Sequence, residues 1–583
     1  MYIETQMCGI FALLNSINAS WETLSREFMK GQGRGPEFSK LDTSYTGMTL
    51  GFHRLAINGL NEASNQPLVI NDVVLICNGE IYNYRQLYKD MRVEPTTGSD
   101  CEVIIHLYLK YGIEQTLLML DGEYAFVLYD NRGNTDHSNR VFVARDPFGV
   151  RPMYYLKNLG LDNNHHAYGF ASELKCLAHF YNTDIANYSV GQFAPGTYSS
   201  FTMSSLGWEM EKENVPYFLP NLQHSWNVNE QVASTMAADM YVRVSAYLNA
   251  AVVKRCLATE RPIACLLSGG LDSSLITALV NNFYMSNNVP SKLETYSIGL
   301  AGSEDLRHAR IVADYLGTKH TEITVTEQEM FDAIPEVILA IESYDTTTVR
   351  ASIGNYLLGK YIAANSDAKV IFNGDGSDEL LGGYLYMNKC PDDIEFDRES
   401  RRLLKDIHLF DVLRSDKSIS SHGLEPRPPF LDIGFVNHML SIPTYFRNHK
   451  NKAGIQTHDH IGIEKFIIRY SFSDKIFRDY CGRQVLPNEI LWRKKEAFSD
   501  GVSNHGRSLF TIIQERICEQ LCVDNPGSTY IPSIEIEKAY YRSIFDEAYP
   551  NCAHILPYFW MPKYTNATDP SARTLTFYTA NPP

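Results

Sequence analysis

Residues 262–280 read Pro-Ile-Ala-Cys-Leu-Leu-Ser-Gly-Gly-Leu-Asp-Ser-Ser-Leu-Ile-Thr-Ala-Leu-Val, and they decide the fold class of the second half of the chain. The apolar run 262–267 predicts a buried strand, and the apolar pattern of 275–280 predicts a helix. A glycine turn between them lets backbone amides converge on an anion at the positive end of the helix. The candidate phosphate donors of this turn are Ser268, Gly269, Gly270, Ser273 and Ser274.

No Gly-Lys-Ser/Thr follows this turn, so it is not the loop that holds a γ-phosphate with lysine. It is typical of enzymes that cleave ATP between the α and β phosphates. A second turn rich in Gly and Asp, 374–379, follows the predicted strand 369–373. The carboxyl ends of parallel strands gather at one edge of a sheet, so we expect Asp272 and Asp378 to hold Mg²⁺ on the pyrophosphate. A Gly-Gly pair alone is usually only a tight turn, but the ordered combination favours a nucleotide site.

Elsewhere the apolar pattern changes period between the two halves. Up to about residue 200, short β-like runs with few helices predict antiparallel layers with helices outside. From residue 236 helices and strands alternate, which predicts βαβ units and a parallel sheet. The polar residues 203–235 read as a linker or long loop. The predicted strands are 49–57, 73–77, 124–129, 140–144, 293–299 and 322–325, and the predicted helices are 101–111, 240–257 and 306–316, with a mainly helical and then loop-rich region beyond residue 380.

Composition excludes several classes of protein. A chain of 583 residues needs two to four domains, and its net charge of −16 argues against nucleic-acid or anionic-membrane partners. Eleven cysteines, scattered and without a CxxC pair, favour a reducing compartment over a disulfide framework or zinc site. No apolar stretch reaches the ~18 residues that a spanning helix needs. We therefore expect a cytoplasmic protein.

A second candidate site lies at the front of the chain. Residues 7–13, Met-Cys-Gly-Ile-Phe-Ala-Leu, place Cys8 before an apolar strand, where a cysteine is more often a core thiol than a nucleophile. Other residues in the first hundred positions favour a catalytic nucleophile: Arg54, the turn 77–80 (Cys-Asn-Gly-Glu) and Asp100. These residues supply an oxyanion donor set and partners for a zwitterionic amino acid.

With these motifs in place, the chain from Met7 to about Tyr578 resembles the glutamine-hydrolysing asparagine synthetases of the eukaryotic type. The matching motifs lie at 34–36, 53–57, 78–83, 145–152, 265–274, 344–352, 423–427, 491–502 and 567–575. So many ordered matches leave little room for coincidence.

The resemblance implies an α+β N-terminal-nucleophile (αββα) glutaminase domain at 8–202, a linker at 203–235, and an α/β parallel-sheet ATP-pyrophosphatase domain with a helical C-terminal part at 236–583. It also implies the reaction. Glutamine gives up ammonia at the first site, and aspartate is activated by ATP as β-aspartyl-AMP at the second. Ammonia passing inside the protein then yields asparagine, with AMP, pyrophosphate and glutamate. Members of the family are often homodimers.

The same resemblance assigns roles in the glutaminase half. Cys8 is the nucleophile, with its own free α-amino group as base, since that group titrates at about 7.7 to 8.0. Asn78 and Gly79 cradle the oxyanion. The glutamine-binding residues implied are Arg54, Leu55, Ala56, Ile57, Asn58, Asn78, Gly79, Glu80 and Asp100.

In the synthetase half, Lys465 matches the lysine that neutralises charge during adenylation and amidation, and Asp375 matches the acidic position tied to forming aspartyl-AMP. Thr347 and Arg350 are implied aspartate or pyrophosphate contacts, although a helix cap and a surface ion pair are equally open interpretations. The ATP-binding residues implied are Leu266, Ser268, Gly269, Gly270, Asp272, Ser273, Ser274, Ile298, Asn373 and Gly374, with Mg²⁺ on Asp272 and Asp378.

The sequence departs from the family pattern in two ways. Family members begin Met-Cys, whereas six residues precede Met7 here. An internal Cys8 has only an amide nitrogen, which cannot act as a base, so we expect translation from Met7 or removal of residues 1–7. In the second place, Asn373 stands where Ser is usual, Asp375 where Glu is usual, and Glu37 where Asp is usual. We expect synthetase activity to be retained.

Three other interpretations stay open. A related class with both domains closes a β-lactam ring, but it has lost the glutaminase residues that are present here. A non-catalytic homologue is a second alternative, although decay should first erase the acidic and glycine positions of both loops. Ammonia-dependent synthesis alone is the third, and it holds if the extension before Met7 is retained.

Overall fold

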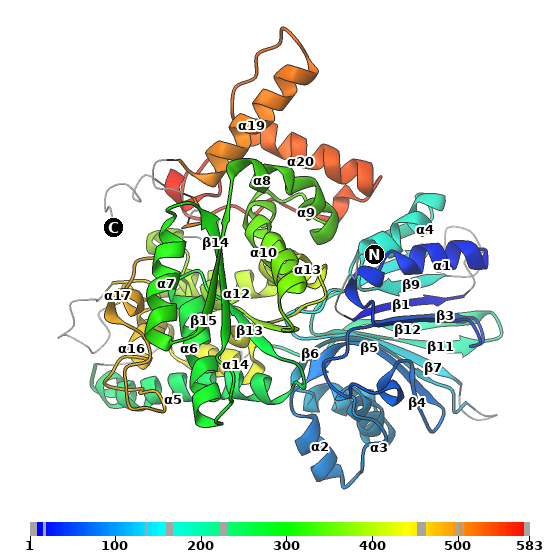
Figure 1. The fold of residues 1–583 in the computed structure, drawn as a ribbon. Coiled ribbons are helices and arrows are strands. Elements are labelled where there is room, and N and C mark those ends of the chain that lie inside the picture. Colours follow the sequence, from blue (N-terminus) through cyan, green and yellow to red (C-terminus); the bar gives the residue numbers. More distant parts are fainter. Residues whose placement is uncertain are drawn as a thin grey trace.

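The computed structural model describes residues 8–15, 19–133, 138–158, 167–220, 230–451, 462–495, 501–503 and 507–575. Its two halves lie side by side (Figure 1). The first half contains two six-stranded antiparallel sheets, and the second contains one five-stranded parallel sheet. The predicted fold class, α+β followed by α/β, is confirmed.

The first half is built from two stacked sheets. One has the order β10-β8-β9-β1-β3-β2, with β1 Gly9–Leu14, β2 Phe38–Asp42, β3 Met48–Arg54, β8 Tyr154–Asn158, β9 Tyr168–Ala171 and β10 Tyr188–Gln192. The other has the order β12-β11-β7-β6-β5-β4, with β4 Leu68–Ile70, β5 Val73–Ile81, β6 Gly122–Asp130, β7 Arg140–Arg145, β11 Thr197–Ser204 and β12 Gly207–Pro216.

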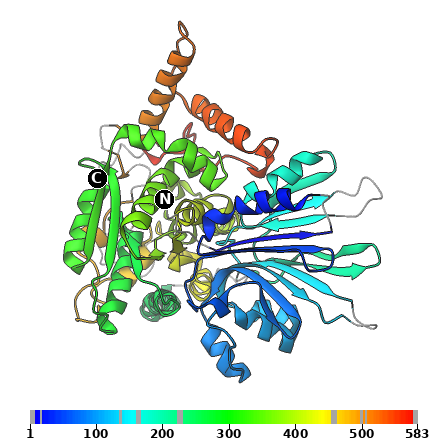
Figure 2. The ribbon, with the colours of Figure 1, turned by 45° about the vertical axis from the view of Figure 1, so that its right-hand side comes forward.

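Both sheets are apolar on both faces, which creates four layers. In β1, Ile10 and Ala12 face the core between the sheets, whereas Phe11 and Leu13 face the helical side. Alternate side chains of a strand point to opposite faces, so a wholly apolar strand needs cover on both. Helices α1 (Trp21–Met29) and α4 (Ala178–Thr183) cover one outer face, and α2 (Tyr84–Met91) and α3 (Glu102–Met119) cover the other (Figures 1 and 2).

In the second half the sheet has the order β15-β14-β13-β16-β17. Its strands are β13 Ile263–Leu266, β14 Glu294–Leu300, β15 Lys319–Val325, β16 Val370–Phe372 and β17 Glu425–Arg427. Helices α5 (Glu230–Leu257), α6 (Leu271–Ser286) and α7 (Glu304–Leu316) contribute to the core on one face, and α9 (Ile334–Ile341) and α10 (Thr346–Asn365) to the core on the other. The later helices are α11 Ser377–Leu381, α12 Asp393–Asp406, α13 Asp411–Ser420, α14 Ile433–Ser441, α16 Phe466–Ser471, α17 Asn488–Leu491, α19 Leu509–Asp524 and α20 Ile534–Ala548.

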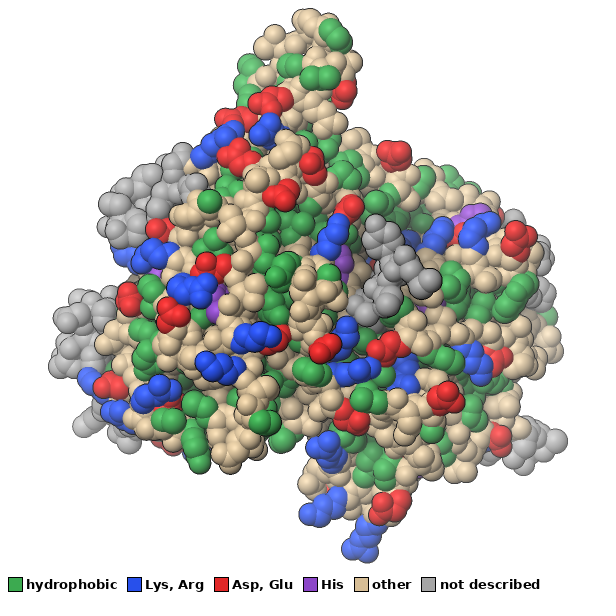
Figure 3. All heavy atoms as spheres, viewed as in Figure 1, with side chains coloured by type: hydrophobic (Ala, Val, Ile, Leu, Met, Phe, Trp, Pro, Cys, Tyr) green, Lys and Arg blue, Asp and Glu red, His purple; other side chains and the backbone are tan. Residues whose placement is uncertain are grey.

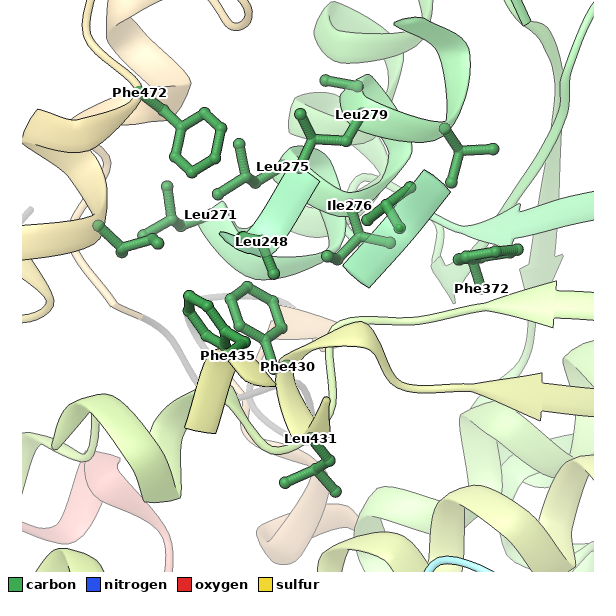
Figure 4. Close-up of a cluster of buried hydrophobic side chains, with 14 of the residues drawn as sticks. Leu248, Leu271, Leu275, Ile276, Leu279, Phe372, Phe430, Leu431, Phe435 and Phe472 are labelled. Carbon is green, nitrogen blue, oxygen red and sulfur yellow. The ribbon is translucent and has the colours of Figure 1, made fainter. Parts of the chain in front are cut away.

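The predicted phosphate turn rests on a fully buried apolar base. Figure 4 shows Leu271, Leu275 and Leu279 of α6 above Phe430 and Phe435, in the same cluster as Phe372 of β16. The side chains of Leu275 and Phe372 have no exposed surface. Such close packing fixes the start of α6 relative to the strand ends.

The predicted strands and the helix at 306–316 are confirmed with small shifts at their ends, whereas the helix predicted at 101–111 continues to Met119 and the one predicted at 240–257 starts at Glu230. Residues 203–235 also differ from expectation. Ser204 ends β11, residues 207–216 form the edge strand β12, and α5 starts at Glu230. The interval 221–229 lies outside the described residues. The linker prediction was wrong at 207–216 because it relied on polar composition. Strand β12 is held at the edge of the sheet by backbone pairing with β11 and by the buried side chain of Trp208. Strand β17 was not predicted at all.

The exterior carries both signs of charge. On the face shown in Figure 3, Lys and Arg side chains are interspersed with Asp and Glu. Within the described ranges no helix has the length and apolar character required to cross a bilayer.

Candidate active sites

The thiol of Cys8 lies where β1 begins. Its Sγ is 3.3 Å from the carbonyl oxygen and 3.4 Å from the amide nitrogen of Leu55, the residue that follows β3. Burial raises the pKa of this thiol to about 12, and the nearby carboxylates of Glu80 and Glu425 act in the same direction. The thiol is therefore protonated at neutral pH and needs a base before it can attack.

The predicted oxyanion donors lie in strand β5, which packs against β1, so the turn expected at 77–80 is part of a strand. Asn78 Nδ2 is 3.3 Å from Ser172 Oγ, and its buried Oδ1 accepts no hydrogen bond from any residue that the structure describes. At Gly79 an added Cβ would lie 2.2 Å from the carbonyl oxygen of Glu123. Only glycine permits this approach of β5 to β6, so the Asn-Gly pair is fixed by packing as well as by chemistry.

Three of the predicted glutamine contacts, Asn58, Glu80 and Asp100, form an acidic cluster. Asn58 Nδ2 donates to Glu80 Oε2 at 2.6 Å and lies 3.4 Å from Asp100 Oδ1, so these two carboxyl groups converge. Burial raises the pKa of Asp100 to about 6 and that of Glu80 well above its usual range, and their mutual repulsion raises the pKa of Glu80 further. Paired acids of this kind suit a bound ammonium group, which relieves both costs.

The guanidinium group of Arg54, expected to bind the glutamine carboxylate, already donates several hydrogen bonds within the protein. It donates to Asn61 O at 2.9 Å, to Asn65 Oδ1 at 2.6 Å and to the carbonyl of Gly59. These bonds hold the loop that follows β3. A glutamine carboxylate would therefore have to replace one of these oxygens on the guanidinium group.

A cavity at the carboxyl ends of β13, β14 and β16 collects most of the predicted nucleotide residues. It is lined by Leu266, Ser268, Gly270, Asp272, Ser273, Ile298, Thr347, Asn373, Gly374, Asp375, Asp378 and Lys465. Two residues of the predicted ATP-binding set, Gly269 and Ser274, lie behind the serine-glycine loop and do not line the cavity. Gly269 has φ +74° and would place a Cβ 2.4 Å from Ala309 N, so it anchors the loop on α7. Ser274 is fully buried in α6.

The acidic residues of the two turns converge on shared lysines. Lys465 Nζ is 2.6 Å from Asp272 Oδ2 and 2.5 Å from Asp378 Oδ1. Lys495 Nζ is 2.6 Å from Asp378 Oδ2. Carboxylates that share one ammonium group also lie close enough to share a small cation, so they fit the expected Mg²⁺ ligands. Lys495 was missed because its 491–502 motif carries several basic residues and no signal separates them.

Asp375 lies at the rim of the same cavity. Its Oδ1 is 3.1 Å from the Arg414 guanidinium, and its buried Oδ2 has no hydrogen-bond partner in the described part of the chain. Burial raises the pKa of this carboxyl to about 6, although Arg414 opposes the rise. Asn373 supports the turn, since its Nδ2 is 2.6 Å from Ser415 Oγ and its Oδ1 accepts from Asp375 N at 3.3 Å.

The two residues implied to contact aspartate, Thr347 and Arg350, occupy different environments in the structure. Thr347 lines the cavity, and the N-cap of α10 is Asp345 rather than Thr347. Arg350 is not among the cavity's lining residues. Its guanidinium is buried against Glu537 at 2.7 Å and Asp569 at 2.8 Å. The ion-pair interpretation therefore describes Arg350, but the pair is buried rather than on the surface.

Buried ion pairs join the two halves, and of the residues in them only Glu80 was given a role from the sequence. Arg34 reaches Asp416 at 2.8 Å, and Arg151 reaches the same carboxylate at 3.1 Å. Arg427 of β17 is 2.7 Å from Glu425 and 3.6 Å from Glu80. The sequence carried one signal of these pairs, because Glu425 and Arg427 lie in the same three-residue buried strand. Charged side chains in a buried strand are retained only when they are paired.

Family models match both halves of the chain. A family model described as a glutamine amidotransferase domain matches residues 7–205, and one described as asparagine synthase matches residues 243–394 and 388–567. The chain is similar to "Asparagine synthetase [glutamine-hydrolyzing]" of Gallus gallus, with 40% identity over 587 residues, 98% of this chain and 99% of the relative. The Homo sapiens protein of the same description is 40% identical over 591 residues, with the same coverage.

Proposed function

The chain belongs to the family of glutamine-hydrolysing asparagine synthetases, and we propose that it makes L-asparagine from L-aspartate, ATP and glutamine. The observation that carries this function is the presence of two separate sites in one chain. Cys8 lies against Leu55 at the end of β3, and Asn78 and Gly79 lie in strand β5, which packs on β1. The serine-glycine loop that follows β13 lies beside two acidic residues and two lysines. AMP, pyrophosphate and glutamate are the by-products.

In the first site the sulfur of Cys8 attacks the side-chain amide carbon of glutamine. The α-amino group of Cys8 takes the thiol proton, which requires that residues 1–7 be absent from the working enzyme. Those residues lie outside the described ones. Asn78 Nδ2 and the Gly79 amide donate to the oxyanion, and ammonia leaves. Water then releases glutamate from the thioester.

Recognition of glutamine rests on the charges around this thiol. The ammonium group of the substrate binds between Glu80 and Asp100, whose pKa values are raised by burial. Its carboxylate binds Arg54, in exchange for one loop carbonyl. The backbone of residues 55–57 forms the adjacent wall.

In the second site a β-carboxylate oxygen of aspartate bonds to the α-phosphorus of ATP, and pyrophosphate leaves with the electron pair of the broken bond. Ammonia then attacks the acyl carbon and AMP leaves. Lys465 neutralises charge during both steps, Asp375 positions the aspartyl group, and Thr347 contacts the substrate. The Mg²⁺ that Asp272 and Asp378 would hold supplies positive charge to the pyrophosphate oxygens.

Ammonia passes between the sites inside the protein in this proposal, and the buried pairs of Arg427 with Glu80 and Arg34 with Asp416 support a fixed arrangement of the halves. We infer domains near 8–202 and 236–583, with β12 added to the first sheet. Eleven free cysteines suit the cytoplasm. Sedimentation tests the expected homodimer.

Asparagine formation with glutamine or ammonium as nitrogen donor tests the proposal. The working enzyme should use both donors and release one pyrophosphate per asparagine. Use of ammonium alone supports the ammonia-dependent alternative. Lack of pyrophosphate release with either donor favours a non-catalytic homologue and contradicts the proposal.

A further inference from the structure

The side-chain amide of Asn78 is held by a single hydrogen bond within the described residues. Its Nδ2 donates to Ser172 Oγ at 3.3 Å, and its buried Oδ1 accepts no hydrogen bond from them. Asn78 is 1% exposed, so bulk water does not hold the amide either. The χ2 torsion of asparagine has broad preferences, so the side chain alone does not fix where Nδ2 points. The direction of this amide therefore depends on Ser172.

Ser172 is fixed to the strand that carries the nucleophile. It directly follows β9, which pairs with β1 in the same sheet (Figure 1). Its amide donates to the carbonyl oxygen of Ile10 at 3.0 Å, and its Oγ accepts from the amide of Ile10 at 3.1 Å. Ile10 lies two residues after Cys8. The buried Ser172 hydroxyl is therefore placed by the backbone of β1.

The residue after Ser172 strengthens this connection to the nucleophile. Glu173 lies 2.9 Å from the guanidinium group of Arg34, whose Nε donates to the carbonyl oxygen of Cys8 at 2.9 Å. The 172–173 segment is therefore bonded to the start of the nucleophile strand at two points, directly at Ile10 and through Arg34 at Cys8. These two bonds fix the Ser172 hydroxyl relative to the backbone that carries the thiol.

The hydrogen-bonding capacity of these groups leaves one donor for a ligand. The Nδ2 atom of Asn78 carries two N–H groups, and only one of them can point at Ser172 Oγ. The second has no acceptor in the described part of the chain. The two lone pairs of the Ser172 hydroxyl accept from the amide of Ile10 and from Asn78. The second N–H of Asn78 is therefore the donor that an oxyanion can use.

We propose that Ser172 is a positioning residue of the glutaminase, which turns the Asn78 amide so that its second N–H meets the oxyanion formed on the Cys8 adduct. The inference rests on the proposed glutaminase function. The sulfur of Cys8 bonds to the amide carbon of glutamine, and the electron pair of the carbonyl moves onto its oxygen, which accepts from Asn78. No bond to Ser172 forms or breaks. Because the negative charge develops only as the adduct forms, loss of this orientation should lower turnover rather than substrate binding.

Glutamine hydrolysis by the enzyme whose chain begins at Cys8 tests this role. Ser172→Ala should lower kcat about 10- to 100-fold, which is part of the loss expected for a whole oxyanion donor, and should leave the KM for glutamine within about threefold. Asparagine formation from ammonium should change less than about twofold, because the second site does not use this amide. Ser199→Ala is the matched control, since Ser199 is also buried and its Oγ accepts from the amide of Asn214 at 3.0 Å, but it lies in β11.

A double variant separates action through Asn78 from a direct effect of Ser172. If Ser172 acts through the amide, Asn78→Ala combined with Ser172→Ala should have the kcat of Asn78→Ala alone, within about twofold. Losses that multiply would overturn the proposal, as would an unchanged kcat in Ser172→Ala or an equal loss of ammonium-dependent synthesis.

A wild-type enzyme that releases no glutamate from glutamine would instead contradict the proposed glutaminase, and the positioning role with it. Thermal unfolding confirms that each variant is folded, and Ser172→Gly replaces the Ala variant if it is not.

Discussion

Arg34 Nε donates a hydrogen bond to the carbonyl oxygen of Cys8 at 2.9 Å. The same guanidinium lies 2.8 Å from Asp416 and 2.9 Å from Ser420 Oγ, both in the second half. One side chain therefore connects the backbone of the nucleophile to the synthetase half. The position of the Cys8 backbone therefore depends in part on the contact between the two halves.

Asp416→Asn should lower glutaminase turnover and thermal stability together. The substitution leaves Arg34 and Arg151 without their shared buried anion, and breaking a buried ion pair costs about 3–5 kcal/mol. Glutamate release and calorimetric unfolding measure the two effects, with the exposed Asp314→Asn as the matched control. A lowered unfolding midpoint with intact glutaminase turnover would show that Arg34 does not transmit the change to Cys8.

We expect the start of the working chain to decide whether the glutaminase functions. A protein expressed from Met7 should lose that methionine and hydrolyse glutamine, whereas a full chain carrying Met7→Leu should hydrolyse none. Both should make asparagine from ammonium, because the second site does not need a free Cys8 amine. Mass spectrometry of each N-terminus accompanies the assay. Full glutamine turnover by a chain whose Met1 is intact would refute the amine-base mechanism.

Asp375 should give adenylation a pH dependence. Its pKa is raised to about 6, so the carboxylate is present above that pH and is lost as pH falls through it. ATP–pyrophosphate exchange with aspartate should therefore decline below about pH 6 in the wild type. Asp375→Asn should be slow and lack this inflection, and the exposed Asp367→Asn should keep it. Persistence of the inflection in Asp375→Asn would assign it to another group.

Gly383→Ala should disrupt the nucleotide site. The new Cβ would lie 2.0 Å from Lys465 Cε and 2.2 Å from Asp378 Oδ1, so the lysine must leave its two carboxylates. We expect at least a ~10-fold loss in pyrophosphate release, comparable with loss of one charge-assisted bond. Gly434→Ala, which has no neighbour closer than 3.2 Å and lies in α14, is the control. Equal activity of the two variants would rule out a role for this close approach.

Arg350 should act through stability rather than substrate contact. Its guanidinium binds Glu537 and Asp569 in the C-terminal region, and the side chains are buried. Arg350→Gln and Glu537→Gln should lower the unfolding midpoint by similar amounts and leave the KM for aspartate within about twofold. A KM increase confined to Arg350→Gln would restore the substrate-contact interpretation.

Much of the fold follows from local patterns. The strand before Ser268 and the helix that starts at Leu271 were predicted, because apolar period and glycine punctuation act over neighbouring residues. The layered first half was predicted for the same reason. Polar composition failed at β12, where backbone pairing with β11 outweighs side-chain polarity.

Local sequence patterns establish which chemical groups the chain carries: a cysteine thiol at residue 8, the Asn78-Gly79 pair, and a serine-glycine loop before a helix. Only the tertiary structure decided that Lys495 lies on Asp378, that Arg350 turns away from the cavity, and that Arg34 links Cys8 to Asp416. The ion pairs among these contacts join residues more than a hundred positions apart. Their formation depends on how sheets and helices stack and on the need to pair every buried charge, and no local pattern encodes either.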